Sequence, residues 1–530
     1  MLGYFILSLL PVTIYFIIKC KKAIHMLQQN WYDDDNRYFK WIINNPYKVF
    51  LEIDMLFVIL FVTIFIPVKM SMIIFGTLYL AFIYVIYRYR QKAQVKKPLV
   101  ITKRVKRLLI TTFLLYLIML SEIIFYYNEE VIGYYYLIIS GMVYFTYFLV
   151  MAANTFNKPV EKYVFNYYKK QAIKKIRNMP KLDVIGITGS YGKTSSKNIL
   201  NDILSIKFNV LPTPKNYNTT NGLMLSINNY LDKFTEVFIA EMGAFKVGEI
   251  KELCDLVQPK YGILTTIGTA HLESFGSEEN IQKGKFELIE SLPADGVAVL
   301  NMDDEKQVSY NIQSDCKKLW VGIDNKDADV YATNIKMSYN GMTFDCIFKG
   351  DKNKYSFSTK LLGRANIYNI LAGIALGKYL GISVEQLIIG VRRVKAIEHR
   401  LELKKYGTIN IIDDAYNSNP VGSKMAVDVL NLMPGYKIIV TPGMIELGDK
   451  QYELNMKFGE YMADVCDEVI LVGEEQTRPI YDGLMHKKYN PKHIHIINDV
   501  KIAFELMQKL KQKETYVLLE NDLPDIFNEK

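Results

Sequence analysis

The sequence is poor in residues that mark several protein classes. Its 530 residues include five cysteines, which lie far apart with no CxxC spacing: Cys20, Cys254, Cys316, Cys346 and Cys466. That scarcity argues against a disulfide framework or a thiolate zinc site. Acidic residues are scarce only in the first third, where residues 1–181 hold 24 Lys and Arg against 9 Asp and Glu. The rest of the chain holds 40 against 46. Because the basic excess is confined to the N-terminal third, we expect no nucleic-acid surface on the remainder.

Long apolar stretches dominate that basic third. Five runs precede residue 152, and each approaches the ~20 residues that cross ~30 Å of hydrocarbon as a helix: Leu2–Ile18, Phe50–Val68, Met70–Tyr87, Leu108–Tyr127 and Val131–Met151. The first run lacks a basic segment before it and a small-residue cleavage site, so we interpret it as a retained span. The alternative, a soluble core, would need five buried helices in the same short stretch. We therefore predict a membrane domain of five transmembrane helices over residues 1–151.

The loops between these runs predict the orientation. Lys and Arg follow the first run, and nine more lie from Arg88 to Arg107, after the third. The other two loops hold Lys69 in one and Asn128 with two glutamates in the other. By the positive-inside rule the N-terminus lies outside, and everything after Met151 is cytoplasmic.

Residues 152–181 are rich in Lys and Tyr, and we interpret them as a basic amphipathic linker. Such a helix could lie on the anionic headgroups of cytoplasmic-membrane lipids or be a solvated connection. The apolar runs themselves carry almost no charge beyond Glu122, since Glu52 and Asp54 are expected at headgroup depth. An ATP-driven transporter, which needs coupling charges inside its spans, is therefore a remote alternative.

A phosphate-binding loop opens the second part of the chain. The apolar run Val184–Ile187 predicts a buried strand, and a helical stretch with one apolar face begins shortly after it. The loop between them reads Thr188, Gly189, Ser190, Tyr191, Gly192, Lys193, Thr194 and Ser195. Glycines let backbone N–H groups approach phosphates, Lys193 is expected to reach the β/γ-phosphates, and the Thr194 hydroxyl to bind Mg²⁺. Because Ile187 replaces the first glycine of the strict motif, the strand–loop–helix context carries this prediction.

Polar residues recur where later apolar strands end. Glu241 follows the run 237–240, His271 comes shortly after 263–267, and Asn301 follows 297–300. Ligands of open α/β sheets bind at the carboxyl ends of strands, so we expect these side chains to face a metal–nucleotide site. The neighbouring Asp303 and Asp304 are equally well explained as turn residues.

A series of motifs follows in order along the remaining chain: GITGSYGKTSSK (186–197), TPKNYNTTNG (213–222), EMGAFKVGEI (241–250), TAHLESFGS (269–277), IQKGKFELIESLP (281–293), GRANIYNILA (363–372), EHRLE (398–402), DDAYNSNP (413–420) and GMIELGDKQ (443–451). Together they resemble the Mur ligase family, ATP-dependent amide-bond synthetases of bacterial cell-wall assembly. The match is best to the MurF type, which adds D-Ala-D-Ala to a UDP-linked muramoyl tripeptide. The resemblance covers about two-thirds of the chain, from Leu182 onward.

The resemblance implies the phosphate and metal ligands. Lys193 and its loop would bind the ATP phosphates, and Arg400 would reach the γ-phosphate from the C-terminal domain. Thr194 and Glu241 would hold one Mg²⁺. His271 would help to hold a second Mg²⁺ together with Lys285, which matches the family's carbamylated lysine. A carbamate would supply the anionic oxygen that Mg²⁺ prefers. The motif leaves Lys283 as the neighbouring alternative to Lys285.

The resemblance also implies nucleoside and substrate contacts. Asn301 and Asn366 match positions near adenine, and Asp414 matches a ribose ligand. The substrate-side positions are asparagines, the first two on the acceptor side: Asn216, Asn218, Asn417 and Asn419.

The sequence departs from the family pattern in three respects. Ala365 stands where a histidine usually precedes Asn366, and Asn455 stands where a histidine often follows the ELG motif. The soluble domain that grips the UDP group is missing, and the apolar region takes its place. We expect a Mur ligase central ATP-binding domain over 182–397, with 329–361 adding an antiparallel hairpin around Asn340-Gly341. A Rossmann-like C-terminal domain is expected over 398–530.

These features predict a membrane-anchored ATP-dependent amide ligase of the α/β class that uses ATP and two Mg²⁺ ions. It would join the amine of an amino acid or dipeptide to an acceptor carboxylate. The MurF-like motifs favour a UDP-linked acceptor. The missing UDP domain favours a lipid-linked or polymeric acceptor, as used by poly-γ-glutamate synthetases of the same superfamily.

Overall fold

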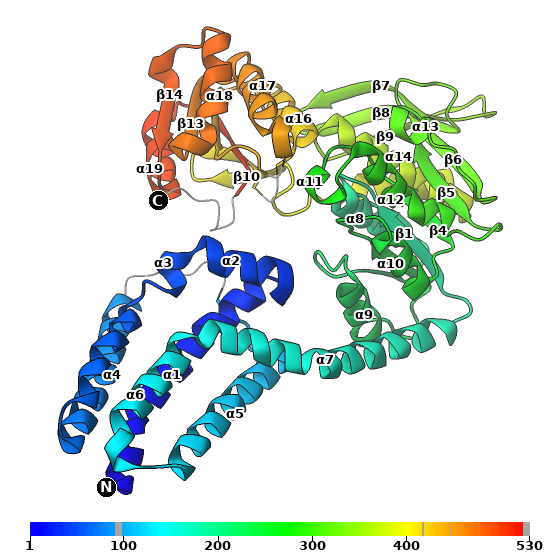
Figure 1. The fold of residues 1–530 in the computed structure, drawn as a ribbon. Coiled ribbons are helices and arrows are strands. Elements are labelled where there is room, and N and C mark those ends of the chain that lie inside the picture. Colours follow the sequence, from blue (N-terminus) through cyan, green and yellow to red (C-terminus); the bar gives the residue numbers. More distant parts are fainter. Residues whose placement is uncertain (91–97, 416–417, 446, 523–530) are drawn as a thin grey trace. The chain divides into compact units, whose positions relative to one another are not determined.

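The computed structural model describes residues 1–90, 98–415, 418–445 and 447–522 (Figure 1). The chain forms two compact units, Met1–Tyr167 and Tyr168–Lys530. The first unit is α-helical. The second holds two separate mixed sheets with their helices, one of nine strands and one of six among the described residues. The predicted fold class, a helical region followed by two α/β domains, is confirmed.

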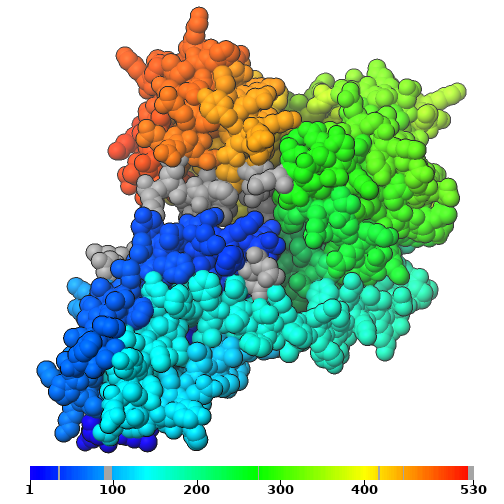
Figure 2. Space-filling model, viewed as in Figure 1, coloured from blue at the N-terminus to red at the C-terminus, as the bar shows by residue number. Residues whose placement is uncertain are grey.

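The first unit is a bundle of apolar helices, drawn blue to cyan in Figures 1 and 2. Its long helices are α1 (Leu2–Gln29), α4 (Val68–Arg90), α5 (Lys103–Phe125) and α7 (Thr146–Arg177), the last of which continues into the second unit. Aromatic rings fill the core, with Phe16 stacked on Tyr116 at 4.1 Å between ring centroids. The shorter elements are η1 (Asp34–Tyr38), α2 (Phe39–Asn44), α3 (Pro46–Val49), η2 (Ile53–Ile64), η3 (Glu129–Val131) and α6 (Ile132–Tyr144).

The number of long apolar helices differs from the five spans predicted from the sequence, and the count of five stays a prediction. Within the described residues, three are long and apolar enough to cross a membrane: Leu2–Gln29, Val68–Arg88 and Lys103–Phe125. A fourth candidate is Glu129–Tyr144 with Thr146–Arg177, which meet at an angle of 66°. The run Phe50–Val68 forms η2, a 3-10 helix of 12 residues. At ~2.0 Å per residue it is about 24 Å long, short of the ~30 Å hydrocarbon layer. Hydropathy alone does not distinguish a 3-10 helix from an α-helix.

One ion pair is buried inside the bundle. Lys19 lies within α1 and pairs with Asp54 of η2, and these side chains are 1% and 2% exposed. The Lys19 ammonium also donates to Tyr144 O at 3.0 Å. The pair is sealed from solvent, so it is suited to fixing η2 against α1 and not to moving ions.

Removing one partner of this pair should destabilise the bundle strongly. Lys19→Met leaves the Asp54 carboxylate buried without its cation, which should cost about 3–5 kcal/mol in the free energy of unfolding. Lys19→Met with Asp54→Leu should recover most of the loss. Lys22 and Glu52 form a more exposed pair on the same elements, and Lys22→Met should cost less than about 1 kcal/mol. Thermal unfolding in detergent measures all three variants, and equal losses for Lys19→Met and Lys22→Met would contradict this assignment.

The larger sheet is parallel at its centre and antiparallel at one end. Its order is β2-β3-β1-β4-β5-β6-β7-β8-β9. The parallel part contains β1 (Asp183–Thr188), β2 (Val210–Pro212), β3 (Val237–Glu241), β4 (Tyr261–Leu264), β5 (Val297–Asn301) and β6 (Lys317–Gly322). The antiparallel part is β7 (Val330–Ser338), β8 (Gly341–Phe348) and β9 (Lys354–Thr359), which confirms the predicted hairpin at Asn340-Gly341. Since β1, β3, β4 and β5 are neighbours, their carboxyl ends meet at one edge.

Helices cover both faces of this sheet. Helix α8 follows β1 and buries Ile199, Leu200, Ile203 and Leu204, the face predicted from the sequence. The helices are α8 (Lys193–Leu204), α9 (Thr220–Asn229), α10 (Glu249–Val257), α11 (Leu272–Phe275), α12 (Glu278–Glu290), α13 (Glu305–Val308), α14 (Arg364–Tyr379) and α15 (Val384–Arg393).

The smaller sheet has the order β10-β11-β15-β12-β13-β14. Five of its strands alternate with helices, as expected of a Rossmann-like domain: β11 (Ile409–Asp414), β12 (Tyr436–Thr441), β13 (Glu468–Val472), β14 (Ile494–Ile497) and β15 (Thr515–Glu520). Strand β10 (Glu402–Tyr406), an antiparallel edge strand, was not predicted, because its polar sequence shows little alternation. The helical elements are α16 (Pro420–Asn431), η4 (Gly448–Lys450), α17 (Gln451–Ala463), α18 (Glu474–His486), η5 (Pro491–His493) and α19 (Val500–Leu510).

Helix α7 crosses the boundary predicted between the last span and the linker. It runs from Thr146 to Arg177 without interruption, although Pro159 lies inside it. The linker predicted over 152–181 is therefore most of this one helix and not a separate segment.

Candidate nucleotide-binding and ligation site

The loop between β1 and α8 has the backbone that a phosphate site requires. Gly189 and Gly192 have φ of 149° and 81°, which L side chains rarely adopt. A Cβ at Gly189 would also overlap the Thr265 hydroxyl. The Lys193 ammonium folds back over the loop and donates to Gly189 O at 2.7 Å and Ser190 O at 3.1 Å. The loop therefore presents its lysine and the N-terminus of α8 at one place, as an anion site needs.

Glu241 at the end of β3 lies directly beside this loop. Its Oε1 accepts the Thr194 hydroxyl at 3.0 Å and the Asn218 amide at 3.3 Å. Its Oε2 is buried without an aligned hydrogen-bond donor, although the Lys197 ammonium lies 3.0 Å away. A buried carboxylate oxygen with spare acceptor capacity, next to a threonine hydroxyl, suits a hard cation such as Mg²⁺. The described residues contain no cluster of three or more His, Cys, Asp or Glu placed to hold a metal, so phosphate oxygens would have to complete the shell.

The nitrogen groups of the site form a cationic cluster. Burial lowers the pKa of Lys193 to about 8, a shift that Glu241 opposes and Arg400 adds to. Burial and Lys193 lower the pKa of Lys285 to about 7. Such a concentration of cations is costly by itself, and a polyphosphate would relieve the repulsion.

His271 is held in a strained conformation at the start of α11. Its φ is 62°, and its ring packs on Phe245 with centroids 4.5 Å apart. Burial, followed by the charges of Lys193 and Lys285, lowers its pKa to about 4. The imidazole is therefore neutral near pH 7, the form that binds a metal.

Lys285 and not Lys283 faces this cluster. Both lie on α12, but the Lys285 side chain is 1% exposed whereas Lys283 is exposed. Its ammonium lies over the Phe275 ring, 5.2 Å from the centroid, and donates to Ala244 O at 3.4 Å. The structure thus supports the sequence-based choice between the two lysines.

A cleft of about 200 Å³ brings most of the predicted residues together. The middle domain contributes to its lining Ser190, Tyr191, Gly192, Lys193, Thr194, Ser195, Asn216, Asn218, Glu241 and His271. The C-terminal domain contributes Arg400, Ser418 and Asn419. Asn419 also caps α16, since its side chain accepts from Gly422 N at 2.9 Å.

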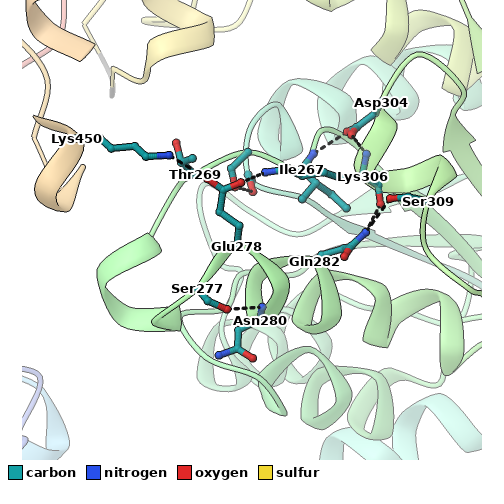
Figure 3. Close-up of polar contacts among 12 residues, drawn as sticks. Ile267, Thr269, Ser277, Glu278, Asn280, Gln282, Asp304, Lys306, Ser309 and Lys450 are labelled. Carbon is teal, nitrogen blue, oxygen red and sulfur yellow. Dashed lines mark hydrogen bonds and ion pairs between the residues drawn. The ribbon is translucent and has the colours of Figure 1, made fainter. Parts of the chain in front are cut away.

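A polar contact joins the two domains beside the cleft (Figure 3). Glu278, at the start of α12, lies 2.5 Å from the Lys306 ammonium and 3.3 Å from that of Lys450. Lys306, and then Lys450, hold the pKa of Glu278 below its ordinary value. Because Lys450 follows the ELG motif, this contact connects the C-terminal domain to the helix that carries Lys285.

Several predicted residues lie outside the cleft lining. The Thr188 hydroxyl is buried and donates to Met242 O at 2.9 Å, and Gly189 does not line the cleft. The Asn366 amide donates to Leu362 O at 2.7 Å, and Asn301 Oδ1 accepts from Asp303 N at 3.0 Å. Their adenine contacts stay predictions. Asn417 lies outside the described residues.

The acidic pair after β5 has a structural role, because it holds two loops that are distant in the sequence. Asp303 accepts the backbone N–H groups of residues 323–325, and Asp304 accepts from Ile267 N at 2.9 Å. Asn455, at the position of a usual family histidine, holds the ELG loop through Met444 N at 2.8 Å and Met444 O at 3.0 Å.

The predicted ribose residue Asp414 is buried against Glu520 at the ends of β11 and β15. Burial raises the pKa of Asp414 to about 6, with Arg400 opposing the shift. Burial and Asp414 raise the pKa of Glu520 well above its usual range. Glu520 also accepts the Ser418 hydroxyl at 2.7 Å. The two acids therefore hold a proton near neutral pH, with Glu520 the better protonated.

Glu520→Gln should stabilise the protein at alkaline pH. A carboxyl whose pKa is raised on folding contributes stability below its unfolded value of 4.5, and this contribution is lost as the pH rises through the folded pKa. Glutamine keeps the neutral form at every pH. We expect Tm to be nearly unchanged at pH 5 and raised by about 2–4 °C at pH 8, as roughly 1 kcal/mol gives in a domain of this size. A Tm difference independent of pH would mean that Glu520 is not buried as the neutral acid.

Two residues of the site were missed although they lie within motifs. Lys197, four residues after Lys193, contacts Glu241, and its place in GITGSYGKTSSK is the signal that could have found it. Asn369 in GRANIYNILA lies against Gly192, within 3.5 Å of where a Cβ would stand.

Comparisons with known proteins agree with this geometry. Residues 187–377 match the Mur ligase middle domain, and residues 399–520 match the Mur ligase glutamate ligase domain. The chain is 34% identical over 296 residues to the UDP-N-acetylmuramoyl-tripeptide–D-alanyl-D-alanine ligase of Bacillus subtilis, covering 55% of this chain and 63% of that protein. It is 31% identical to the Escherichia coli ligase of the same name, covering 57% of this chain and 66% of that protein. The chain thus spans slightly less than two-thirds of the length of these relatives.

The solved structures give the same result. A MurF ligase from Thermotoga maritima in complex with ADP is 27% identical with a TM-score of 0.59, covering 67% of this chain and 80% of that chain. Both domain matches begin after residue 186, and the apolar helices stand where the UDP-binding domain would be. The chain belongs to the Mur ligase family, with the family's middle and C-terminal domains behind a region of long apolar helices.

Proposed function

We propose that the protein is a membrane-anchored, MurF-like ligase that uses ATP to form an amide bond between an acceptor carboxylate and the amine of an amino acid or dipeptide. The observation that carries this is the single cleft that holds Lys193, Glu241 and His271 from the middle domain with Arg400 from the C-terminal domain. The relatives named as D-alanyl-D-alanine ligases support the reaction class.

In this reaction the acceptor carboxylate attacks the γ-phosphorus of ATP, and ADP leaves as an acyl phosphate forms. The amine then attacks the acyl carbon, the amide forms, and phosphate leaves. Lys193 and Arg400 lie where they would offset the negative charge that gathers during phosphoryl transfer. Because Arg400 comes from the second domain, the cleft is complete only when the two domains approach.

Two Mg²⁺ ions would supply charge neutralisation to the triphosphate. Thr194 and Glu241 would hold one, and Glu241 Oε2, which lacks an aligned hydrogen-bond donor, fits that role. The neutral His271 would contribute to the second with a carbamylated Lys285. The lowered pKa and the burial of Lys285 favour a neutral amine that can react with CO₂.

The apolar helices support a location in the bacterial cytoplasmic membrane. The basic residues around them favour an N-terminus outside and catalytic domains in the cytoplasm. On α7 the exposed Phe156, Val160 and Tyr163 fall on one stripe, which favours contact of this helix with the lipid headgroup layer.

A second candidate acceptor is a lipid-linked or polymeric carboxylate. The specific observation that favours it is the replacement of the UDP-binding domain by apolar helices. An acceptor that is attached to a membrane lipid or polymer has no UDP group, so its ligase would not need a UDP-binding domain.

Phosphate release by the full-length protein in detergent, with ATP and Mg²⁺, tests both candidates. One arm contains UDP-muramoyl tripeptide with D-Ala-D-Ala, and the other contains a bacterial lipid extract with pooled amino acids. Release with the soluble pair, with the matching amide found by mass spectrometry, would establish a tethered MurF activity. Release only with the lipid extract would establish a lipid-linked or polymeric acceptor. No substrate-dependent release in either arm would contradict the proposed ligase.

A further inference from the structure

Lys197 is a buried lysine that the phosphate chemistry does not use. It lies on α8, one turn after Lys193, and its side chain is 2% exposed. Its ammonium lies 3.0 Å from Glu241 Oε2 and donates to Lys215 O at 2.5 Å. A buried ammonium needs a counter-charge and further acceptors, and these two contacts supply them.

The partner carbonyl belongs to the acceptor-side loop, which we define as residues 213–222. Three more contacts fix this loop to the same strand end. Glu241 N donates to the Thr213 hydroxyl at 3.2 Å, Asn218 donates to Glu241 Oε1 at 3.3 Å, and Gly243 N donates to Asn218 O at 2.8 Å. Lys197 is the one side chain among these contacts that carries a charge complementary to Glu241.

We propose that Lys197 is a positioning residue that links the acceptor-side loop to the metal-binding carboxylate. The Lys197 ammonium contacts Glu241 Oε2 and Lys215 O at the same time. A cation that binds Glu241 therefore repels this ammonium and changes its hydrogen bond to the loop. By thermodynamic reciprocity, fixing the loop must alter cation binding by the same factor. Nucleotide binding is thereby communicated to the acceptor side before any chemistry. The name of the loop and the metal role of Glu241 rest on the proposed function, whereas the contacts of Lys197 with Glu241 and Lys215 do not.

The test is amide hydrogen exchange of the full-length protein in detergent, with and without ADP and Mg²⁺. In Lys197→Met we expect exchange over residues 213–222 to rise about tenfold, a typical size for coupling between contacting groups. Exchange over β1 and α8 should be unchanged, and the loop should no longer respond to ADP and Mg²⁺. The Mg²⁺ concentration that half-saturates ADP binding should fall severalfold, because a competing cation has been removed.

Lys207→Met is the matched control. Lys207 also donates to backbone carbonyls, Leu380 O at 3.2 Å and Gly381 O at 2.8 Å, but neither belongs to this site. It should leave loop exchange and the Mg²⁺ dependence at wild-type values. If Lys197→Met does not fold, Lys197→Gln keeps a donor for Lys215 O without the charge and takes its place in both measurements.

The proposal is overturned if the loop still responds to ADP and Mg²⁺ in the Lys197 variant, if the Mg²⁺ dependence does not move, or if exchange rises evenly across the middle domain. The last result would give Lys197 a merely structural role. If the wild-type protein shows no ligase activity with any acceptor tested, the proposed function is wrong. The hydrogen-exchange test remains valid in that case, because it needs only ADP and Mg²⁺.

Discussion

Lys193→Ala should abolish ATP-dependent phosphate release and amide formation, with kcat lowered at least about 10³-fold, as expected when a main stabiliser of transition-state charge is lost. The ammonium stands over the loop whose glycines can approach phosphates, 2.7 Å from Gly189 O. The alanine substitution removes the one cationic side chain of the loop, which is expected to contact the β/γ-phosphates. Initial rates of phosphate release at saturating ATP measure the loss, and Lys207→Ala, outside the cleft, should keep normal rates. Near-normal activity of Lys193→Ala would end the assignment of this loop as the nucleotide site.

The same residue gives the site a pH dependence. Its pKa is about 8, lowered mainly by burial. Bound phosphates favour the charged form, so nucleotide affinity should weaken as the pH rises above about 8 and Lys193 loses its proton. This decline should be present in ADP titrations of the wild type between pH 7 and 9 and absent in Lys193→Ala. An identical decline in the variant would assign it to another group.

The parts of the fold that follow from local pattern were predictable. Strand β1, the loop glycines and the apolar face of α8 can all be read from residues that are adjacent in sequence. The same holds for the hairpin at Asn340-Gly341. The membrane region was less predictable, because hydropathy reports that a segment is apolar but not whether it forms an α-helix or the shorter 3-10 helix η2.

Contacts between distant residues were not readable from the pattern. The pairing of Lys19 with Asp54 depends on how two helices pack, and nothing in either local sequence shows it. Lys197 looks like any lysine on a helix until β3 and the acceptor-side loop close around it. In the same way Glu520 appears in the sequence as an ordinary strand residue, and only its register beside Asp414 makes it a buried neutral acid.

The burial of Lys285 predicts a chemical modification with a large effect on activity. A neutral amine attacks CO₂, a nitrogen–carbon bond forms, one proton is released, and the side chain becomes a carbamate anion. A pKa of about 7 leaves much of the amine neutral at physiological pH. The modification would place an anion among Lys193 and His271, where the unmodified ammonium adds to the repulsion. Mg²⁺ prefers such oxygen ligands, so carbamylation would convert an unfavourable neighbour into a metal ligand.

Lys285→Ala should therefore lower kcat about 10²–10³-fold, the range for losing one preorganised electrostatic group. Acetate or formate, which can enter the space left by the side chain as a carboxylate, should restore part of the activity. Lys283→Ala is the control, because that exposed neighbour on the same helix should leave the rate unchanged. Wild-type protein depleted of CO₂ should lose activity and regain it with bicarbonate, and ¹³C-labelled bicarbonate should give a carbamate resonance that Lys285→Ala lacks. If bicarbonate changes neither the rate nor the spectrum, Lys285 acts as an amine, and the second metal ion would need a different ligand.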